Sequence, residues 1–197
     1  MNITRLTKSA ATEVFWGKIS PSEHMVQIYE DSSAFLDSLE GFVAGGLVAG
    51  DAVIIIATPV HLVALETRLA KRGINLFEAL AADQYIALEA EKTLAKFMRN
   101  GWPDEDLFRK LVTTLLGRAK AGGRSVRAFG EMVAILWAQG NNGATIQLEH
   151  MWHRLCHEEM FSLFCAYPKS GFTQDESVSI KEICATHSRV VPIRANA

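Results

Sequence analysis

The sequence predicts one α/β domain built on a doubly wound, mainly parallel sheet with helices on both faces. The run at residues 52–57 (AVIIIA) is apolar at every position and largely β-branched, which is typical of a central strand covered by helices on both sides. Similar runs alternate with segments of helical spacing, and such alternation produces parallel strands joined by right-handed crossovers. With 197 residues, the chain can bury one sizeable core and is short for two domains.

The first strand and its helix are expected within residues 24–50. The segment 24–30 (HMVQIYE) reads as a strand, and Asp31 follows it as an N-cap before apolar residues at helical spacing. Gly45, Gly46 and Gly50 are expected to weaken and end this helix, because glycine costs about 1 kcal/mol relative to alanine inside a helix.

The strand at 52–57 is followed by Thr58 and Pro59. Threonine is a favourable N-cap and proline suits the first helical position, so a helix is expected from here to Gly73. The remaining elements are expected in this order: a strand at 84–88, a short helix at 92–98, a long helix from Asp104 to Gly122, a strand at 125–129, a helix directly after it, a helix at 144–159, a strand at 161–167 and a last helix at 175–187.

Residues 1–22 carry no strong periodicity and end in Ser-Pro-Ser. We expect a lead-in segment there, with a short helix near residues 10–15, in front of a single domain at 23–197. Phe15 and Trp16 make the end of the segment apolar, which would suit a contact with a second copy of the chain. A homodimer is therefore expected.

Composition predicts a soluble, cytoplasmic protein without nucleic-acid contact. The net charge is −2 with acidic and basic residues interleaved, whereas a nucleic-acid-binding surface concentrates basic residues. No stretch approaches the ~18 apolar residues of a membrane span, and the N-terminus lacks a signal-peptide core. Cys156, Cys165 and Cys184 have no C-x-x-C spacing and read as small buried residues in a reducing cytosol.

A nucleotide hydrolase of this shape needs a phosphate-binding loop, and the sequence lacks one. No G-x-x-x-x-G-K-[ST] segment occurs. The turn after the strand at 52–57, Ala57 to His61, is too short, its Pro59 removes a backbone donor, and no lysine follows. We therefore expect no enzymatic activity and no bound cofactor.

Glu131 is the main site candidate because it follows the strand at 125–129 directly. Open α/β sheets bind ligands at the carboxyl ends of their strands. Gly130, just before it, would let the backbone turn sharply or approach a ligand closely. Two interpretations remain open: the carboxylate contacts a ligand, or it caps the helix that starts beside it.

Other candidate ligand-binding residues lie at neighbouring strand ends. Tyr29 and Glu30 end the first strand, and Thr58 and His61 follow the second, so these residues should share the rim with Glu131 if the strands are parallel. His61 has no partner visible in the sequence, which leaves a purely structural role open. Trp102 stands in an Asn-Gly-Trp-Pro loop and could form a lid or a partner contact.

Three histidines, His150, His153 and His157, fall on one stripe of the helix expected at 144–159. His153 and His157 have the i, i+4 spacing that chelates a metal ion. His150 is too far along the helix, about 10.5 Å from His157, to join them on one ion. A solvated stripe or a subunit contact is the alternative, and we expect no metal site beyond this weak candidate pair.

Five segments resemble a known family when read in order: HMVQIYED, GLVAGDAVIIIATPVHL, VRAFGEMVAILWAQGN, LEHMWHRL and SLFCAYP. Together they resemble the MEDS domain, the sensory domain of methanogen and methylotroph regulators that include the dichloromethane-responsive repressor. The resemblance covers about residues 24–187. It implies a RecA-like or KaiC-like fold that has lost nucleotide hydrolysis, and a sensory role with one-carbon or hydrocarbon-derived compounds as ligands.

The expected function is therefore a cytoplasmic sensory domain that binds a small ligand and relays its presence to a kinase or a transcription regulator. One alternative is an adaptor with no ligand of its own. A second is residual nucleotide binding or hydrolysis. The sequence shows no helix-turn-helix, phosphoacceptor or kinase signature, so the output is expected to pass through another protein.

Overall fold

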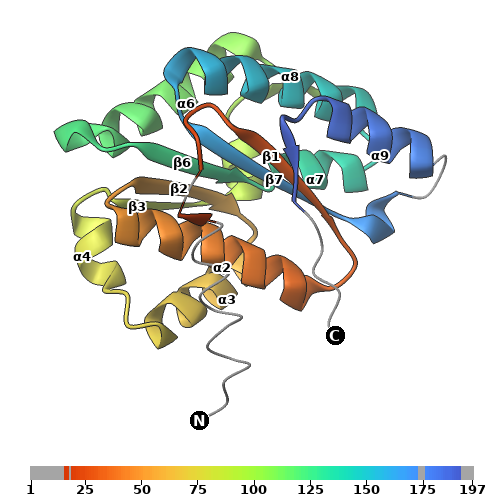
Figure 1. The fold of residues 1–197 in the computed structure, drawn as a ribbon. Coiled ribbons are helices and arrows are strands. Elements are labelled where there is room, and N and C mark those ends of the chain that lie inside the picture. The colour runs from red at the N-terminus through yellow and green to blue at the C-terminus, as the bar shows by residue number, and fades with distance from the viewer. Residues whose placement is uncertain (1–15, 18, 173–175, 192–197) are drawn as a thin grey trace.

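The computed structural model describes residues 16–17, 19–172 and 176–191. Its main element is a six-stranded sheet in the order β3-β2-β6-β7-β1-β8 (Figure 1). Every neighbouring pair in this sheet is parallel, which confirms the predicted fold class. The strands are β1 (His24–Tyr29), β2 (Ala52–Ala57), β3 (Tyr85–Glu89), β6 (Val126–Gly130), β7 (Ser162–Pro168) and β8 (Arg189–Val190).

Helices cover both faces of the sheet (Figure 1). One face carries α2 (Ser32–Ala49), α3 (Pro59–Lys71) and α4 (Leu76–Ala81). The other face carries α5 (Ala90–Leu94), α6 (Glu105–Ala119), α7 (Met132–Ala138), α8 (Asn142–Glu159) and α9 (Glu176–Ala185). Short 3-10 turns at Ala121–Gly123 and Lys169–Gly171 connect these layers.

Strand β2 shows why the sheet is covered twice. Val53 and Ile55 lie in the core shared with α2 and α3, whereas Ile54 and Ile56 lie in the core shared with α6 and α8. All six residues of the strand are buried. Because the side chains of a strand alternate between its faces, an apolar strand of this kind is stabilised only when layers close over both.

Helix α2 ends at the last of the three glycines that the sequence predicts to weaken and end it. It continues through Gly45 and Gly46 to Ala49 and ends at Gly50, which has a left-handed φ of 85°. Gly45 and Gly46 allow neighbouring side chains to pack closely against the helix. A Cβ added at Gly46 would lie 2.9 Å from Cδ of Arg127, and one added at Gly45 would lie 3.2 Å from Cβ of Trp16. The prediction is therefore confirmed for Gly50, which ends the helix, and wrong for Gly45 and Gly46, which lie inside it.

Several short elements were not predicted. They are helix α4, the antiparallel hairpin of β4 (Met98–Arg99) and β5 (Trp102–Pro103), and strand β8 beside β1. The helix expected at 92–98 is the shorter α5. Elements of two to six residues are too short to show a periodicity in sequence. The N-caps Asp31 and Asp104 are confirmed, since both carboxylates accept bonds from backbone N–H groups of the first turn.

A buried arginine fastens the amino-terminal part of the chain to the sheet. Arg127 of β6 is 4% exposed, and its Nε lies 2.7 Å from the Asp51 carboxylate. Its Nη1 donates to the backbone carbonyls of Trp16 and Phe42. Burying a guanidinium is tolerated only when it is paired in this way.

Trp16 packs into this chain's own core. Its ring is 2% exposed, and the ring centroids of Phe42 and Phe164 lie 5.7 and 5.5 Å away. The indole is therefore covered within the chain, contrary to the expectation that it contributes to a contact with a second copy. Phe15 and the helix expected at residues 10–15 lie outside the described residues.

Within the described part of the chain, none of the helices combines the length and the apolar character that crossing a bilayer requires.

We expect Gly46→Ala to lower the free energy of unfolding by about 1–3 kcal/mol, because the new methyl group would press on Arg127 and Val53. Gly117→Ala is the matched control, since Gly117 is also inside a helix and a Cβ there meets nothing within 4 Å. That change should raise stability by about 0.5–1 kcal/mol through helix propensity alone. Urea unfolding of both variants tests this, and equal effects would contradict it.

Candidate functional site

The candidate site lies where neighbouring strands β2 and β6 lead to opposite sides of the sheet. Strand β2 continues into α3 on one face and returns as β3, whereas β6 continues into α7 and α8 on the other face and returns as β7. The two connections therefore diverge at the carboxyl ends of adjacent strands. This is the switch point at which open α/β sheets bind ligands.

Glu131 lies at this switch point and bridges the two strand ends. Its N–H donates to the carbonyl of Ile56, 2.9 Å away. Its Oε2 accepts from the N–H of Thr58 at 2.8 Å, and its Oε1 lies 2.7 Å from Nδ1 of His61. The residue is 7% exposed, so both carboxylate oxygens are used inside the protein.

The helix that Glu131 caps is α3 and not its own. Thr58 is the N-cap residue of α3, but its side chain makes no capping bond. The Glu131 carboxylate binds the Thr58 N–H in its place, near the positive end of the helix dipole. Glu131 also precedes α7, where its side chain makes no capping bond. The interpretation that it caps the neighbouring helix α7 is wrong, because its side chain reaches across to β2.

Aromatic rings line the rim beside this carboxylate. Tyr29 stacks on Phe35 with ring centroids 4.6 Å apart, and the edge of His61 meets Phe35 at 5.0 Å. Burial, and secondarily the Glu131 charge, raises the pKa of Tyr29 to about 12. The Tyr29 hydroxyl therefore keeps its proton at neutral pH and can donate a hydrogen bond.

The structure brings four of the predicted site residues together: Tyr29, Thr58, His61 and Glu131. The other predicted residues, Glu30, Trp102 and Gly130, contribute no side chain to this group. Glu30 is exposed and its carboxylate pairs with Lys169 at 2.6 Å. Trp102 is 53% exposed on the β4–β5 hairpin, and it packs over the start of α8, where a Cβ at Gly143 would lie 2.9 Å from its ring.

Gly130 has no special backbone role. Its φ is not positive, and a Cβ added there would meet the Trp152 ring at 3.7 Å, an ordinary van der Waals distance. Gly130 is the last residue of β6, so the structure does not use it for a glycine-specific turn, and the close approach to a ligand stays a prediction.

Carboxylates of the chain itself occupy the helix N-termini at this edge. Asp31 accepts from the N–H groups of Ser33 and Ala34 at the start of α2, and Glu131 accepts from Thr58 at the start of α3. Helix N-termini are the places where phosphate groups bind in nucleotide-binding folds. A nucleotide phosphate at either start would have to displace an internal carboxylate.

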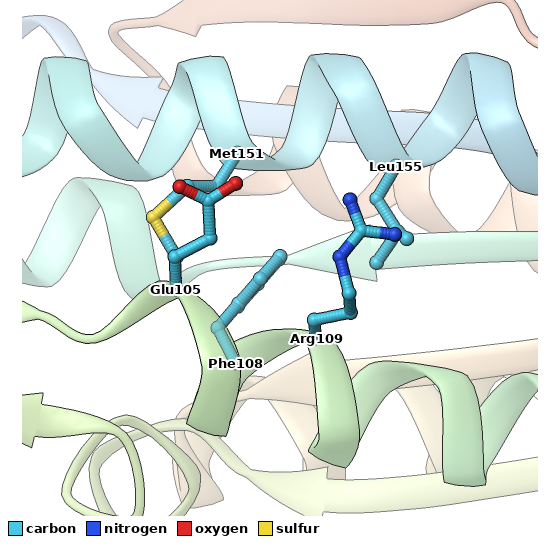
Figure 2. Close-up of a pocket in the computed structure, with 5 residues that line it drawn as sticks. All are labelled: Glu105, Phe108, Arg109, Met151 and Leu155. Atoms are coloured by element: carbon cyan, nitrogen blue, oxygen red, sulfur yellow. The ribbon is translucent and has the colours of Figure 1, made fainter.

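A small hollow lies between α6 and α8 (Figure 2) and shares no residue with the group around Glu131. It is too small to hold a water molecule and is lined by Glu105, Phe108, Arg109, Met151 and Leu155. Ion pairs join the two helices beside it: Arg109 to Glu158 and Arg154 to Glu105, each at 2.7 Å. The hollow is a packing gap in a helix–helix contact and not a ligand pocket.

The three histidines of α8 do not form one solvated stripe. His150 and His157 are exposed, but His153 is half-buried, and its ring lies 5.7 Å from that of His24. His153 and His157 are 4.5 Å apart between ring centroids. The surface side of α8 is therefore occupied by two of the three histidines, and the third faces the protein interior.

Sequence reasoning missed a second cluster of titratable side chains. It consists of His24, Glu149, Cys165 and His187. The available signal was Glu149, which falls on the buried stripe of α8 between Thr145 and Trp152. A carboxylate at such a position requires partners inside the protein, although the sequence does not say which ones.

Comparisons with known proteins agree with this architecture. The family model of the methanogen/methylotroph, DcmR sensory domain (MEDS) matches residues 23–188. A solved structure from Pyrococcus horikoshii OT3, described as a structural study, is similar with a TM-score of 0.60 and 13% sequence identity. The similarity covers 92% of this chain and 87% of that one, and it supports a Rossmann/RecA-like fold. The comparison with curated proteins gives no match.

We expect Glu131→Ala to lower the free energy of unfolding by about 1–3 kcal/mol, because the Thr58 N–H and His61 lose their acceptor. Glu131→Gln should cost less, since an amide oxygen can still accept from Thr58. Glu30→Ala is the control, because an exposed ion pair contributes under about 1 kcal/mol. Thermal and urea unfolding measure the stability of the three variants. If Glu131→Ala is as stable as Glu30→Ala, the bridge from Glu131 does not stabilise the fold.

Proposed function

Because the chain belongs to the MEDS family of sensory domains, we propose that it binds a small molecule at the Glu131 rim and passes its occupancy to a partner protein through α3. The observation that carries this proposal is the bridge from Glu131 to Thr58 and His61. It joins the switch point of the sheet to the first turn of one helix. A ligand that binds to the Glu131 carboxylate would compete with its bonds to Thr58 and His61, and so change how the start of α3 is fixed to the sheet.

The rim favours a small ligand with little charge. Its aromatic rings, Tyr29 and Phe35, stack on each other and are buried, so they make the surroundings of the carboxylate apolar, while Glu131 and His61 offer hydrogen-bonding groups. A one-carbon or hydrocarbon-derived compound with one polar group fits this combination. An anionic ligand would meet the Glu131 carboxylate.

Helix α3 connects the rim to an exposed apolar surface. His61 faces Glu131 from the first turn of α3, and Val60 and Val63 of the same helix are 74% and 66% exposed. Phe77 of the following helix α4 is 82% exposed. Exposed apolar groups of this kind mark protein contacts when they gather on one surface. We assign this surface to the partner, which is a kinase, a transcription regulator or a second copy of the chain.

The proposed role is not enzymatic. The internal carboxylates at the starts of α2 and α3 support the absence of nucleotide hydrolysis, since they replace the phosphate groups that these helix ends would otherwise bind. The free thiols of Cys156, Cys165 and Cys184 support a reducing compartment, the cytoplasm.

An adaptor without a ligand is the second candidate function. It is favoured by the fact that both Glu131 oxygens already have partners in the protein. In that case the bridge is permanent and only the α3–α4 surface acts in signalling.

We expect native mass spectrometry of the freshly purified chain to detect a retained small molecule, and Glu131→Gln to weaken its binding about 10- to 100-fold in calorimetric titration. Glu30→Gln serves as the control and should bind as the wild type does. A chain that carries no molecule, with partner binding unaffected by Glu131→Gln, would favour the adaptor.

We also expect no hydrolysis of ATP or GTP above the buffer rate in the presence of Mg²⁺. The physical reason is that the carboxylates of Asp31 and Glu131 already accept from backbone N–H groups at the starts of α2 and α3, where a phosphate group would bind. A phosphate-release assay measures this. Magnesium-dependent turnover that Glu131→Gln abolishes would contradict the proposed role.

A further inference from the structure

Four side chains with metal-ligating atoms meet on the face of the sheet opposite α3. His24 is the first residue of β1, Glu149 belongs to α8, Cys165 belongs to β7, and His187 lies between α9 and β8. One ligand atom from each lies within 4.8 Å of all the others. The four side chains are fully buried, and the proposed sensory rim uses none of them.

Four of the six distances between ligand atoms in this cluster are close to those of a tetrahedral site, and the remaining two are at most 4.8 Å. Glu149 Oε2 lies 3.4 Å from Nε2 of His24 and 3.4 Å from Nε2 of His187. Cys165 Sγ lies 3.5 Å from Nε2 of His24 and 3.8 Å from Glu149 Oε2. A tetrahedral zinc site with ordinary bond lengths separates nitrogen and oxygen ligands by about 3.3 Å, and sulfur from either by about 3.6 Å.

The ring of His187 is oriented as a metal ligand would be. Its Nδ1 lies 2.6 Å from the carbonyl oxygen of Ile183, so Nδ1 carries the proton and donates it. In the neutral ring Nε2 then presents a lone pair to the cluster, where Glu149 Oε2 lies 3.4 Å away without hydrogen-bond geometry. Histidine ligands of metals characteristically donate their other N–H to a backbone carbonyl in this way.

Glu149 is also held from outside the cluster. The Tyr167 hydroxyl donates to its Oε1, which leaves Oε2 directed at the two histidines and the cysteine.

We propose that His24, Glu149, Cys165 and His187 form a closed binding site for one divalent cation of the Zn²⁺ type. Two nitrogens, one sulfur and one oxygen suit a metal of intermediate softness. The Cys165 thiolate and the Glu149 carboxylate balance the charge of the ion, so the filled site has no net charge. With four buried protein ligands it has no open position, which is the arrangement of structural and not catalytic sites. This reverses the sequence-based expectation that the chain has no such site.

A row of histidines gives the cation a route from solvent. His157 is exposed on α8, His153 lies 4.5 Å from it, and His24 lies 5.7 Å beyond His153 between ring centroids. The i, i+4 pair therefore serves as the entrance to the site in this proposal, and the ion itself rests inside.

The bound ion would fasten the carboxyl-terminal elements to the sheet. His187 follows α9 and precedes β8, whereas Glu149 and Cys165 belong to α8 and β7. One ion thus joins four segments that are distant in sequence. Because the site shares no residue with the rim at Glu131, its test is independent of the proposed function.

We expect the full-length chain, stripped with a chelator and titrated with Zn²⁺, to bind one equivalent and to melt at a higher temperature when loaded. Loaded with Co²⁺ instead, it should show the thiolate charge-transfer absorption and the intense visible bands of a tetrahedral Co²⁺ site. Cys165→Ser should remove the charge-transfer absorption, and His187→Ala should weaken Zn²⁺ binding at least 100-fold. Tyr167→Phe should weaken it about 10- to 100-fold, the usual effect of losing a partner of a ligand.

Two control variants test whether the ion binds at this site or at neighbouring residues. Cys156→Ser changes a thiol that is equally buried but donates to the carbonyl of Phe161, and His157→Ala changes the exposed histidine; both should still bind one equivalent. The proposal is overturned if the folded wild type binds no Zn²⁺, or if bound Co²⁺ shows no thiolate absorption. It is also overturned if binding is lost in His157→Ala but kept in Cys165→Ser, which would put the ion at the surface.

Discussion

A parallel sheet that is buried on both faces leaves no water for the charged groups inside it, and this constraint organises the whole molecule. Each buried charge must find its partner within the chain. Arg127 does so through Asp51 and two carbonyls, and Glu131 does so through Thr58 and His61. These pairings connect strands to helices that are 70 or more residues apart in sequence. The polar contacts therefore set how the two layers sit on the sheet.

The same constraint explains how a nucleotide-binding type of fold exists without a phosphate loop. Helix N-termini at the sheet edge present unpaired N–H groups, and a nucleotide-binding protein leaves them to a ligand. Here Asp31 and Glu131 supply the negative charge from within the chain. The helix ends are thus stabilised without a ligand. What remains at the edge is a carboxylate between a histidine and a pair of stacked aromatic rings.

The sequence predicts features that depend on neighbouring residues, and it fails where a feature depends on a distant one. The strand at β2 and the caps Asp31 and Asp104 are local, and they were found. Gly46 was misread because its packing partner, Arg127, lies on another strand. Glu131 was identified as a site residue, but its attachment to α3 depends on the β2–β6 pairing. The His24 cluster stayed hidden because it joins four segments that only the strand order brings together.

The helices on the two faces are attached to the sheet in different ways. On one face, Glu131 contacts Thr58 and His61 at the start of α3, and α3 also packs through the buried Leu65 and Leu69. On the other face, α8 and the segment after α9 meet β1 and β7 at a buried cluster. Cys165 of that cluster pairs in register with Gly130, the residue before Glu131. The buried cluster and the Glu131 bridge are thus linked through the β6–β7 pairing, and in the proposed function a change at Glu131 acts on the first turn of α3.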